Sequence, residues 1–215
     1  MNKQLKNILK KIYFLPDTII NSIYLFLKNV KFEKNLQIKE FVYIQNRGEI
    51  ILGKNVRIRS HYKSNPICGL PNTRLLTHNT GKICIGSGTG ISCSIIYSRE
   101  NIRIGENVLI GAGVKIYDTD FHSINPYIRT QYIEIEEIPK TKSVIIEDFA
   151  FIGADSIILK GSTIGKYSII GAGSVVSGYV PSGEIWAGNP ARFIRKLTDE
   201  ELKMPMTNIE KYNNF

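Results

Sequence analysis

The residues most able to do chemistry in this sequence lie in one short segment, Asp-Thr-Asp-Phe-His, at positions 118–122. A histidine can remove the proton of a hydroxyl group near neutral pH, and such general base help accelerates a reaction ~100-fold to 10,000-fold. Asp120 is close enough in sequence to His122 to orient its ring or to stabilise its cation. We therefore predict that His122 and Asp120 are catalytic and that Asp118 shapes the turn. The competing interpretation of His122 is an ordinary surface histidine.

Basic residues gather near the carboxyl end, around and after the string Gly188-Asn-Pro-Ala-Arg192. The string is followed by Phe-Ile and then by Arg195 and Lys196. Guanidinium groups pair well with phosphate oxygens, so this cluster is compatible with a polyanionic ligand. The competing interpretation is that these are solvated charges after the last structural repeat.

The elements that must position these residues follow a six-residue period. An aliphatic residue returns at positions 146, 152, 158, 164, 170 and 176, and Ala or Ser usually follows four places later. One such unit cannot bury its apolar side chain alone, so the units stack into a β-helix. Three units make one coil, which predicts that each aliphatic residue lies over the one 18 positions later, about 4.8 Å away.

The period covers residues 36–180 but fails in two stretches, residues 60–80 and 123–143. Insertions into stacked repeats map to loops, often on the binding face. The second stretch follows His122 directly and mixes apolar residues with charged ones such as Arg129. We predict that this second loop is functional and that it contacts a partner, because so apolar a loop is poorly placed in water alone.

The amino end is basic and apolar, with seven lysines against Asp17 and Glu33 in residues 1–35. Its apolar residues follow helical spacing on both sides of Pro16, in runs too short to cross a bilayer. We expect this segment to cap the first coil or to pack on a neighbouring subunit, with peripheral membrane contact through residues 1–35 as the alternative. At the other end, Thr198 to Glu201 is a capping-box pattern for a short helix.

The composition is that of a soluble globular protein, with 215 residues of which 43% are hydrophobic and 22% charged. The three cysteines show no paired spacing, which predicts free thiols and a cytoplasmic location. The basic amino end adds a peripheral position at the inner face of the membrane as an alternative. The formal net charge of +9 is compatible with polyanionic ligands. Nucleic acid is not expected, because the basic residues are scattered and no recognition motif accompanies them.

Together these features resemble the hexapeptide-repeat acyltransferases, and the Asp-Thr-Asp-Phe-His segment resembles their sugar and polysaccharide O-acetyltransferase branch. That branch includes maltose, galactoside and polysialic acid O-acetyltransferases. The resemblance implies an all-β fold, a left-handed parallel β-helix with short N- and C-terminal helices and extended loops. We expect an N-terminal helical segment (1–35), the β-helix acyltransferase domain (36–190) and a cofactor-contacting tail with a helix (191–215).

The resemblance also assigns roles at the site. It implies that His122 is the general base and that Gly-Asn-Pro-Ala-Arg marks the end that binds coenzyme A. The implied cofactor contacts are the backbone near Ala154 and Ala172, Phe151 beside the thioester, and Arg192, Arg195 and Lys196 on the phosphates. A backbone NH of the corner at residues 152–154 is the expected oxyanion donor. One departure is Gly178-Tyr179, where many relatives carry Lys-Asp and so a further basic contact.

Two residues are expected to contact the acceptor, Ser92 and Arg129. Ser92 lies in a Gly-Ile-Ser segment like that of the same branch, but a small residue at a corner has an equal structural explanation. The resemblance further implies a homotrimer with active sites between subunits. The γ-type carbonic anhydrases share the fold and bind zinc through three histidines. Here the histidines are 17 and 44 residues apart and two lie in an irregular loop, so we expect no metal.

The sequence therefore predicts an acetyl-CoA-dependent O-acetyltransferase that modifies a saccharide, such as a capsular or lipopolysaccharide sugar, by direct attack. An N-acetyltransferase acting on a nucleotide-linked amino sugar is the first alternative, because hydroxyl and amine acceptors need much the same base. The second alternative is a trimeric scaffold without activity, docked to a membrane or a glycosyltransferase.

Overall fold

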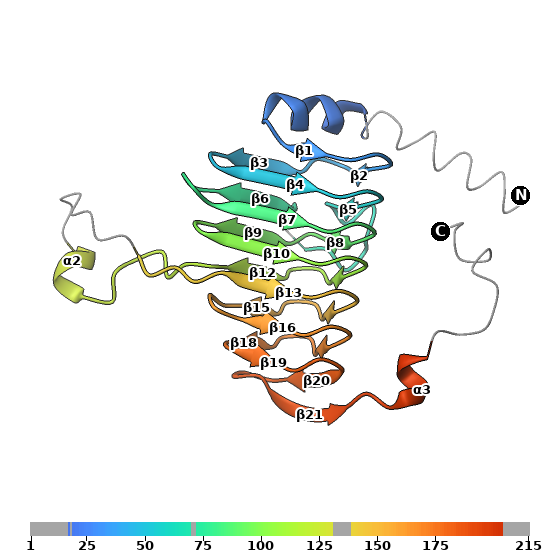
Figure 1. Cartoon of the computed structure of the whole chain (residues 1–215). Coiled ribbons are helices and arrows are strands. Elements are labelled where there is room, and N and C mark those ends of the chain that lie inside the picture. The colour runs from blue at the N-terminus through green and yellow to red at the C-terminus, as the bar shows by residue number, and fades with distance from the viewer. Residues whose placement is uncertain (1–16, 18, 70–71, 131–138, 204–215) are drawn as a thin grey trace, which may run out of the picture.

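The computed structural model describes residues 17, 19–69, 72–130 and 139–203, which fold as a left-handed parallel β-helix (Figure 1). The described strands form three sheets that run along the sides of a prism. Sheet A contains β1 (Lys31–Phe32), β4 (Glu49–Leu52), β7 (Lys82–Ile85), β10 (Asn101–Ile104), β13 (Val144–Ile146), β16 (Thr163–Ile164) and β19 (Tyr179–Val180). Sheet B contains β2 (Gln37–Lys39), β5 (Arg57–Arg59), β8 (Gly90–Ser92), β11 (Leu109–Ile110), β14 (Phe151–Ile152), β17 (Ile169–Ile170), β20 (Glu184–Ala187) and β21 (Arg192–Lys196). Sheet C contains β3 (Tyr43–Asn46), β6 (Arg74–Thr77), β9 (Ile95–Ser98), β12 (Lys115–Tyr117), β15 (Ile157–Ile158) and β18 (Val175–Val176).

The core is a set of aliphatic columns with the register that the six-residue period predicts. The confirmed pairs are Ile146 with Ile164, Ile152 with Ile170, and Ile158 with Val176. All six side chains are buried, and each column is continued by further aliphatic residues of the coils above. Stacking therefore removes from water the apolar surface that a single unit would expose.

Each coil passes from sheet A to sheet B to sheet C, so the prism has an A–B, a B–C and a C–A corner. Small residues occupy the corners as expected, and Ser156, Ser162, Ser168 and Ser174 are fully buried there. Their hydroxyl groups bond to the neighbouring coil; the Oγ of Ser156, for example, donates to the carbonyl of Gly171 at 3.0 Å. The serines thus satisfy corner carbonyls that the strands leave unpaired.

The two interruptions of the period leave from different corners. The first loop joins β5 to β6 at the B–C corner, and the second joins β12 to β13 at the C–A corner. An antiparallel bridge between Thr119 and Thr141 closes the neck of the second loop, which we call the arm (residues 119–141). The arm carries the short helix α2 (Pro126–Thr130), which stands away from the coils in Figure 1.

Helical residues lie at both ends of the described chain. Residues 19–27 are helical and lie across the first coil, where Leu25 is buried and Asn21 bonds to the carbonyl of Glu40 at 2.7 Å. The other expected run, at residues 8–13, lies outside the described residues. At the carboxyl end α3 (Asp199–Leu202) has the predicted capping box between Thr198 and Glu201. No described helix is long and apolar enough to span a membrane.

The cysteines depart from the sequence prediction. Cys68 of the first loop and Cys93 of the B–C corner form a disulfide with a Cα–Cα distance of 5.7 Å, and Cys84 is free. The prediction of three free thiols is therefore wrong, and the expectation of a cytoplasmic location loses the cysteine argument on which it was based. Sequence spacing could not reveal the pair, because it depends on the first loop folding back over its own corner.

Candidate active site

The segment that contains His122 begins at a firmly held aspartate, directly after β12. Asp118 is fully buried, and its carboxylate accepts hydrogen bonds from the Oγ of Ser98 at 2.7 Å and from the backbone NH groups of Arg99 and Glu100 at 2.8 and 2.9 Å. Its own carbonyl accepts from the NH of Lys142 across the neck of the arm at 2.9 Å. Asp118 thus has the turn-shaping role that the sequence predicts for it.

Aromatic packing then sets the direction of the chain at His122. Phe121 has a left-handed backbone conformation with φ of 65°, and its ring contacts those of Tyr97 and Tyr117 on sheet C, with centroids 4.9 and 5.1 Å apart. Burial raises the pKa of Tyr117. The backbone NH of His122 donates to the carbonyl of Asp120 at 2.8 Å, and His122 is exposed. The packing of Phe121 therefore fixes the backbone before His122 and leaves the His122 side chain accessible to a substrate.

Asp120 has a partner that the sequence analysis missed. Its Oδ1 lies 2.8 Å from the Nζ of Lys160, which follows β15 in the next coil. In the described residues no hydrogen bond joins this carboxylate to the ring of His122, so orientation of that ring by Asp120 stays a prediction. The strand register offers a signal for this partner. Because Ile116 pairs with Ile158, the residues two places further along, Asp118 and Lys160, lie level in adjacent coils, close to Asp120.

The second half of the site is a ladder of small residues at the B–C corner. The NH of Gly153 donates to the carbonyl of Ile170, and the NH of Gly173 to the carbonyl of Ala154, both at 2.8 Å. A Cβ on Gly153 would lie 2.5 Å from the nitrogen of Ala172, so only glycine permits this close stacking. The amides of Ala154 and Ala172 donate no hydrogen bond to the described residues. They are the predicted cofactor positions, and Ala154 is the free donor at the expected oxyanion corner.

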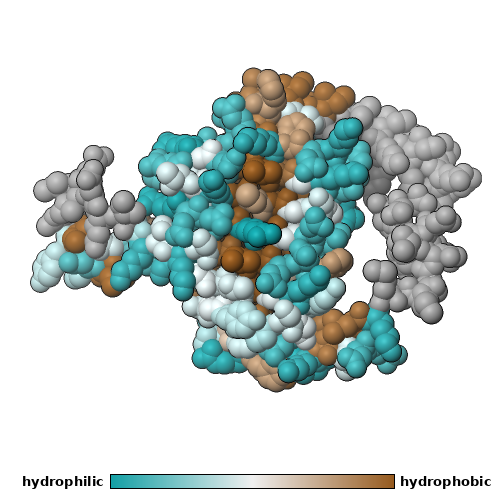
Figure 2. Space-filling view, in the orientation of Figure 1, coloured by the Kyte–Doolittle hydropathy of each residue, from teal (hydrophilic) through white to brown (hydrophobic). Residues whose placement is uncertain are grey.

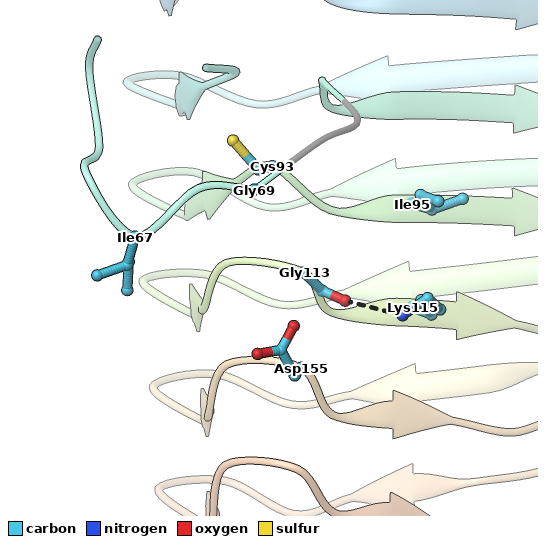
Figure 3. A pocket seen from close by; sticks show the side chains of 7 residues that line it. All are labelled: Ile67, Gly69, Cys93, Ile95, Gly113, Lys115 and Asp155. Carbon is cyan, nitrogen blue, oxygen red and sulfur yellow. Dashed lines mark hydrogen bonds between the residues drawn. The ribbon is translucent and has the colours of Figure 1, made fainter. Parts of the chain in front are cut away.

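A small pocket of about 140 Å³ lies above this ladder, at the same corner (Figure 3). The first loop contributes Ile67 and Gly69, and the disulfide of the adjacent Cys68 holds them over the corner. The remaining lining residues come from three coils: Cys93, Ile95, Gly113, Lys115 and Asp155. Sequence analysis missed this pocket, because nothing in the first loop's composition shows to which corner it returns.

The basic cluster at the carboxyl end follows the last coil, on β21. A cis peptide at Asn189-Pro190 precedes this strand, which pairs antiparallel with β20. Arg195 is engaged by Glu201 through two bonds of 2.7 and 2.8 Å, which hold the pKa of Glu201 at about 2. No described carboxylate pairs with Arg192 or Lys196, and both are exposed. Arg192 and Lys196 are therefore available to a phosphate, whereas Arg195 has a competing carboxylate.

The other predicted contacts are dispersed. Phe151 points outward from sheet B between Leu109 and Ile169 and is 42% exposed. Ser92 is half-buried at the end of β8, beside the B–C corner. Arg129 lies in the arm, where its Nη1 donates to the carbonyl of Ile124 at 3.4 Å. One copy of the chain does not bring Ser92 and Arg129 together.

The remaining histidines lie apart from His122. His61 is in the first loop, with its ring 4.1 Å from that of Tyr62, and His78 follows β6 at the C–A corner. Burial, together with the positive charges of Arg99 and Arg47, lowers the pKa of His78. Across the described ranges no three side chains among His, Cys, Asp and Glu converge as metal ligands would.

The two halves of the site thus lie at opposite edges of sheet C within one chain. His122 leaves from the C–A corner, whereas Ala154 and Ala172 lie at the B–C corner. β12 alone spans three residues, or about 10 Å of sheet between the two corners. A proton donor and its base must come within about 3 Å of each other. Within one copy the histidine cannot serve a ligand bound along the alanine ladder.

Comparison with known proteins is consistent with this architecture. Residues 143–178 match the family model for the bacterial transferase hexapeptide (six repeats). Among curated proteins, the chain is 31% identical to γ carbonic anhydrase 1 of Arabidopsis thaliana, over 63% of this chain and 52% of the relative. It is 34% identical to a galactoside O-acetyltransferase of Lactococcus lactis, over 58% of this chain and 59% of the relative. The chain therefore spans only about half the length of the curated relatives it matches.

One group of solved structures matches over more of the chain. A variant of AntD, an N-acyltransferase from Bacillus cereus in complex with dTDP-4-amino-4,6-dideoxyglucose and coenzyme A, is 27% identical, with a TM-score of 0.60 over 94% of this chain and 92% of that one. A hexapeptide-repeat acetyltransferase of Vibrio cholerae is 34% identical, with a TM-score of 0.51, over 58% of this chain and 68% of that one. With the repeat register, the corner ladder and this coverage in agreement, the chain belongs to the hexapeptide-repeat family of acyltransferases.

Proposed function

We propose that this protein transfers an acetyl group from acetyl-CoA to a hydroxyl group of a saccharide. The observation that carries the proposal is the Asp-Thr-Asp-Phe-His segment, in which buried Asp118 and packed Phe121 present an exposed His122. The galactoside O-acetyltransferase among the relatives supports an oxygen acceptor. A capsular or lipopolysaccharide sugar, or the growing polymer, is the proposed acceptor class.

The proposed donor site follows the B–C corner. The uninterrupted row of small residues leaves room for a pantetheine arm, and the amides of Ala154 and Ala172 can donate to its carbonyls. Arg192 and Lys196, which no described carboxylate engages, would meet the phosphates, and Phe151 would lie beside the thioester. Solved relatives bound to acetyl-CoA and to coenzyme A support this assignment.

The proposed reaction is direct attack without an acyl-enzyme. His122 removes the proton of the sugar hydroxyl as its oxygen forms a bond to the thioester carbonyl, and the NH of Ala154 donates to the oxyanion. When the carbon–sulfur bond breaks, the proton held by His122 passes to the thiolate, so coenzyme A leaves as the free thiol. Asp120 and Lys160 would hold the neck of the arm while this happens.

Separation of the two halves supports a site shared between copies of the chain. If sheet C of each copy faces a common threefold axis, the C–A corner of one copy meets the B–C corner of the next. The outward side chains of that sheet include Ile95, Tyr97, Tyr117, Ile157 and Val175, all half-buried, which suits a contact surface. Such a homotrimer would bring His122 of one copy to Ala154 of another, with the arm and Arg129 reaching across to the acceptor.

An amino-sugar acceptor is the second candidate, and the AntD structure favours it through its coverage of 94% of this chain. The deciding experiment incubates the full chain and acetyl-CoA with neutral polysaccharides, sialic-acid polymers or nucleotide amino sugars, and measures thiol release and the acetylated product. An ester product, cleaved by mild alkali, supports the proposal. An amide formed only with amino sugars supports the second candidate, and no transfer to any acceptor contradicts both.

A further inference from the structure

The helical residues 19–27 have an inner face that packs on the first coil and an outer apolar face that is exposed. On the inner face Leu25 is buried, Asn21 bonds to the first coil, and the ring of Tyr24 packs on Phe41 with centroids 5.1 Å apart. The outer face consists of Ile19, Ile20, Ile23, Phe26 and Leu27, with exposed fractions between 53% and 75%. A helix that is apolar on all sides is normally buried, and a contiguous exposed apolar patch marks an interaction surface.

The described residues at this end of the β-helix are also basic. Residues 17–57 hold seven lysines and arginines against four acidic residues, a net +3. Among the described residues, Lys28, Lys34 and Lys54 are exposed beside the helix, and Lys31 pairs with Glu49 at 2.7 Å. A shallow depression at this end is lined by Phe32, Lys34 and Lys54 together with the acidic Glu33. Figure 2 shows hydrophobic side chains at this end of the molecule, and further ones down the middle of the visible face between polar flanks.

We infer that this end of the β-helix docks on an anionic lipid surface. The outer face of residues 19–27, which we call the cap face, would enter the interface, and the surrounding lysines would meet the headgroups. An apolar helix face bordered by lysines is the arrangement that binds such surfaces, since apolar burial and attraction to anionic lipid add together. A purely apolar partner would not account for the charge, and a nucleic acid would not account for the five exposed apolar side chains.

The inference sets the height of the candidate site above the lipid. In sheet C three strand spacings separate β3 of the first coil from β12, which precedes His122. At about 4.8 Å a spacing, His122 would lie roughly 14 Å beyond the first coil. The cap face therefore holds the site at one distance from the membrane, within reach of a saccharide carried there. Docking itself does not depend on the reaction proposed above.

The test compares two matched pairs of substitutions in the full chain by sedimentation with vesicles. Phe26→Ser with Leu27→Ser alters the cap face, at side chains 75% and 71% exposed. Ile124→Ser with Tyr127→Ser alters the arm, at side chains 74% and 77% exposed. Vesicles of phosphatidylcholine alone are compared with vesicles that also contain phosphatidylglycerol. Equal thermal midpoints for the variants and the unmodified protein show that all are folded.

We expect the unmodified protein to bind the anionic vesicles and to leave them as salt rises. The cap-face pair should bind at least ~10-fold more weakly, whereas the arm pair should bind as the unmodified protein does. Lys34→Gln with Lys54→Gln should weaken binding to the vesicles that contain phosphatidylglycerol and leave binding to phosphatidylcholine vesicles unchanged. The inference is overturned if the unmodified protein ignores the vesicles or if both pairs bind alike. It is also overturned if the cap-face substitutions convert a larger oligomer into a smaller one without weakening vesicle binding. In that case a second copy of the chain, and not lipid, covers this face.

Discussion

The carboxylate of Asp120 lies 2.8 Å from the ammonium group of Lys160. Asp120 is two residues before His122, and Lys160 lies in the next coil along sheet C. The pair joins the neck of the arm to the rigid part of the β-helix. Both side chains are about 30% exposed, at 31% and 29%. A partly exposed ion pair contributes little to the overall stability of a fold, so we expect this pair to matter through the position of His122.

Loss of this pair should lower turnover modestly. We expect Lys160→Met to reduce kcat about 2-fold to 5-fold, because a partly exposed ion pair contributes about 0.2–1 kcal/mol. The KM for acetyl-CoA should not change. Steady-state kinetics of Lys166→Met, a lysine at the A–B corner, is the control for loss of one positive charge. Equal effects of the two substitutions would show that the Asp120 contact has no role at the site.

The free amide of Ala154 can be tested by a change of one donor. Asp155 has φ of 59°, so Ala154 precedes a left-handed residue, a turn position that accepts proline. Ala154→Pro removes the NH and closes a ring on that nitrogen, and it should lower kcat about 100-fold to 1,000-fold, as loss of an oxyanion donor does elsewhere.

Ala172→Pro makes the same change one coil away, before Gly173 with φ of 67°. It should raise the KM for acetyl-CoA and leave kcat within a few-fold. If both prolines lower kcat alike while thermal midpoints hold, Ala154 is not the oxyanion donor.

The three basic residues of β21 should differ in their contribution to donor binding. Arg192→Ala and Lys196→Ala should each raise the KM for acetyl-CoA about 5-fold to 20-fold, as a charge-assisted contact to phosphate is lost. Arg195→Ala should have a smaller effect, since Glu201 already engages that side chain.

Competition from Glu201 should persist throughout ordinary assay pH. The pKa of Glu201 is lowered from 4.5 to about 2, so its carboxylate stays ionised above pH 4.5 and is lost only as pH falls towards 2. Glu201→Gln should therefore free Arg195 and lower the KM for acetyl-CoA. An equal loss of affinity for all three alanine variants would contradict this difference.

The disulfide should contribute to stability only in the oxidised protein. It closes a loop of 25 residues, which corresponds to about 3 kcal/mol of unfolding free energy when the bond constrains the unfolded chain. Cys68→Ser should lower the denaturation midpoint to that of the reduced unmodified protein, and dithiothreitol should not lower it further. Cys84→Ser serves as the control for a free thiol. If dithiothreitol does not change the denaturation midpoint of the unmodified protein, the Cys68–Cys93 disulfide does not constrain its unfolded state.

The regular part of the molecule could be predicted from the sequence, because each repeat depends only on its neighbours. The spacing of 18 residues between Ile152 and Ile170 translates directly into a strand pair. The same register puts Lys160 level with Asp118, but the carboxylate that Lys160 meets is that of Asp120, two residues further along the chain. By contrast, the partner of Cys68 and the corner to which Ile67 returns depend on an irregular loop with no period.

The two faces of residues 19–27 illustrate a further limit. Helical spacing predicts an apolar stripe, but Leu25 and Phe26 are both apolar, and only contact with the first coil separates the buried residue from the exposed one. Likewise, the sequence names Arg192, Arg195 and Lys196 as equals. Only the position of α3 shows that Arg195 donates hydrogen bonds to Glu201, whereas the other two have no carboxylate partner among the described residues. What the sequence leaves open is therefore decided by packing between elements without a repeat.

The central claim is that His122 is the base, and one comparison tests it most directly. Acetyl transfer is measured for His122→Ala and for His78→Ala, a histidine at the same corner two coils away, together with the Kd for acetyl-CoA by calorimetry. We predict that His122→Ala loses at least ~100-fold in kcat with an unchanged Kd, whereas His78→Ala keeps both values. Normal turnover by the folded His122→Ala protein would contradict it.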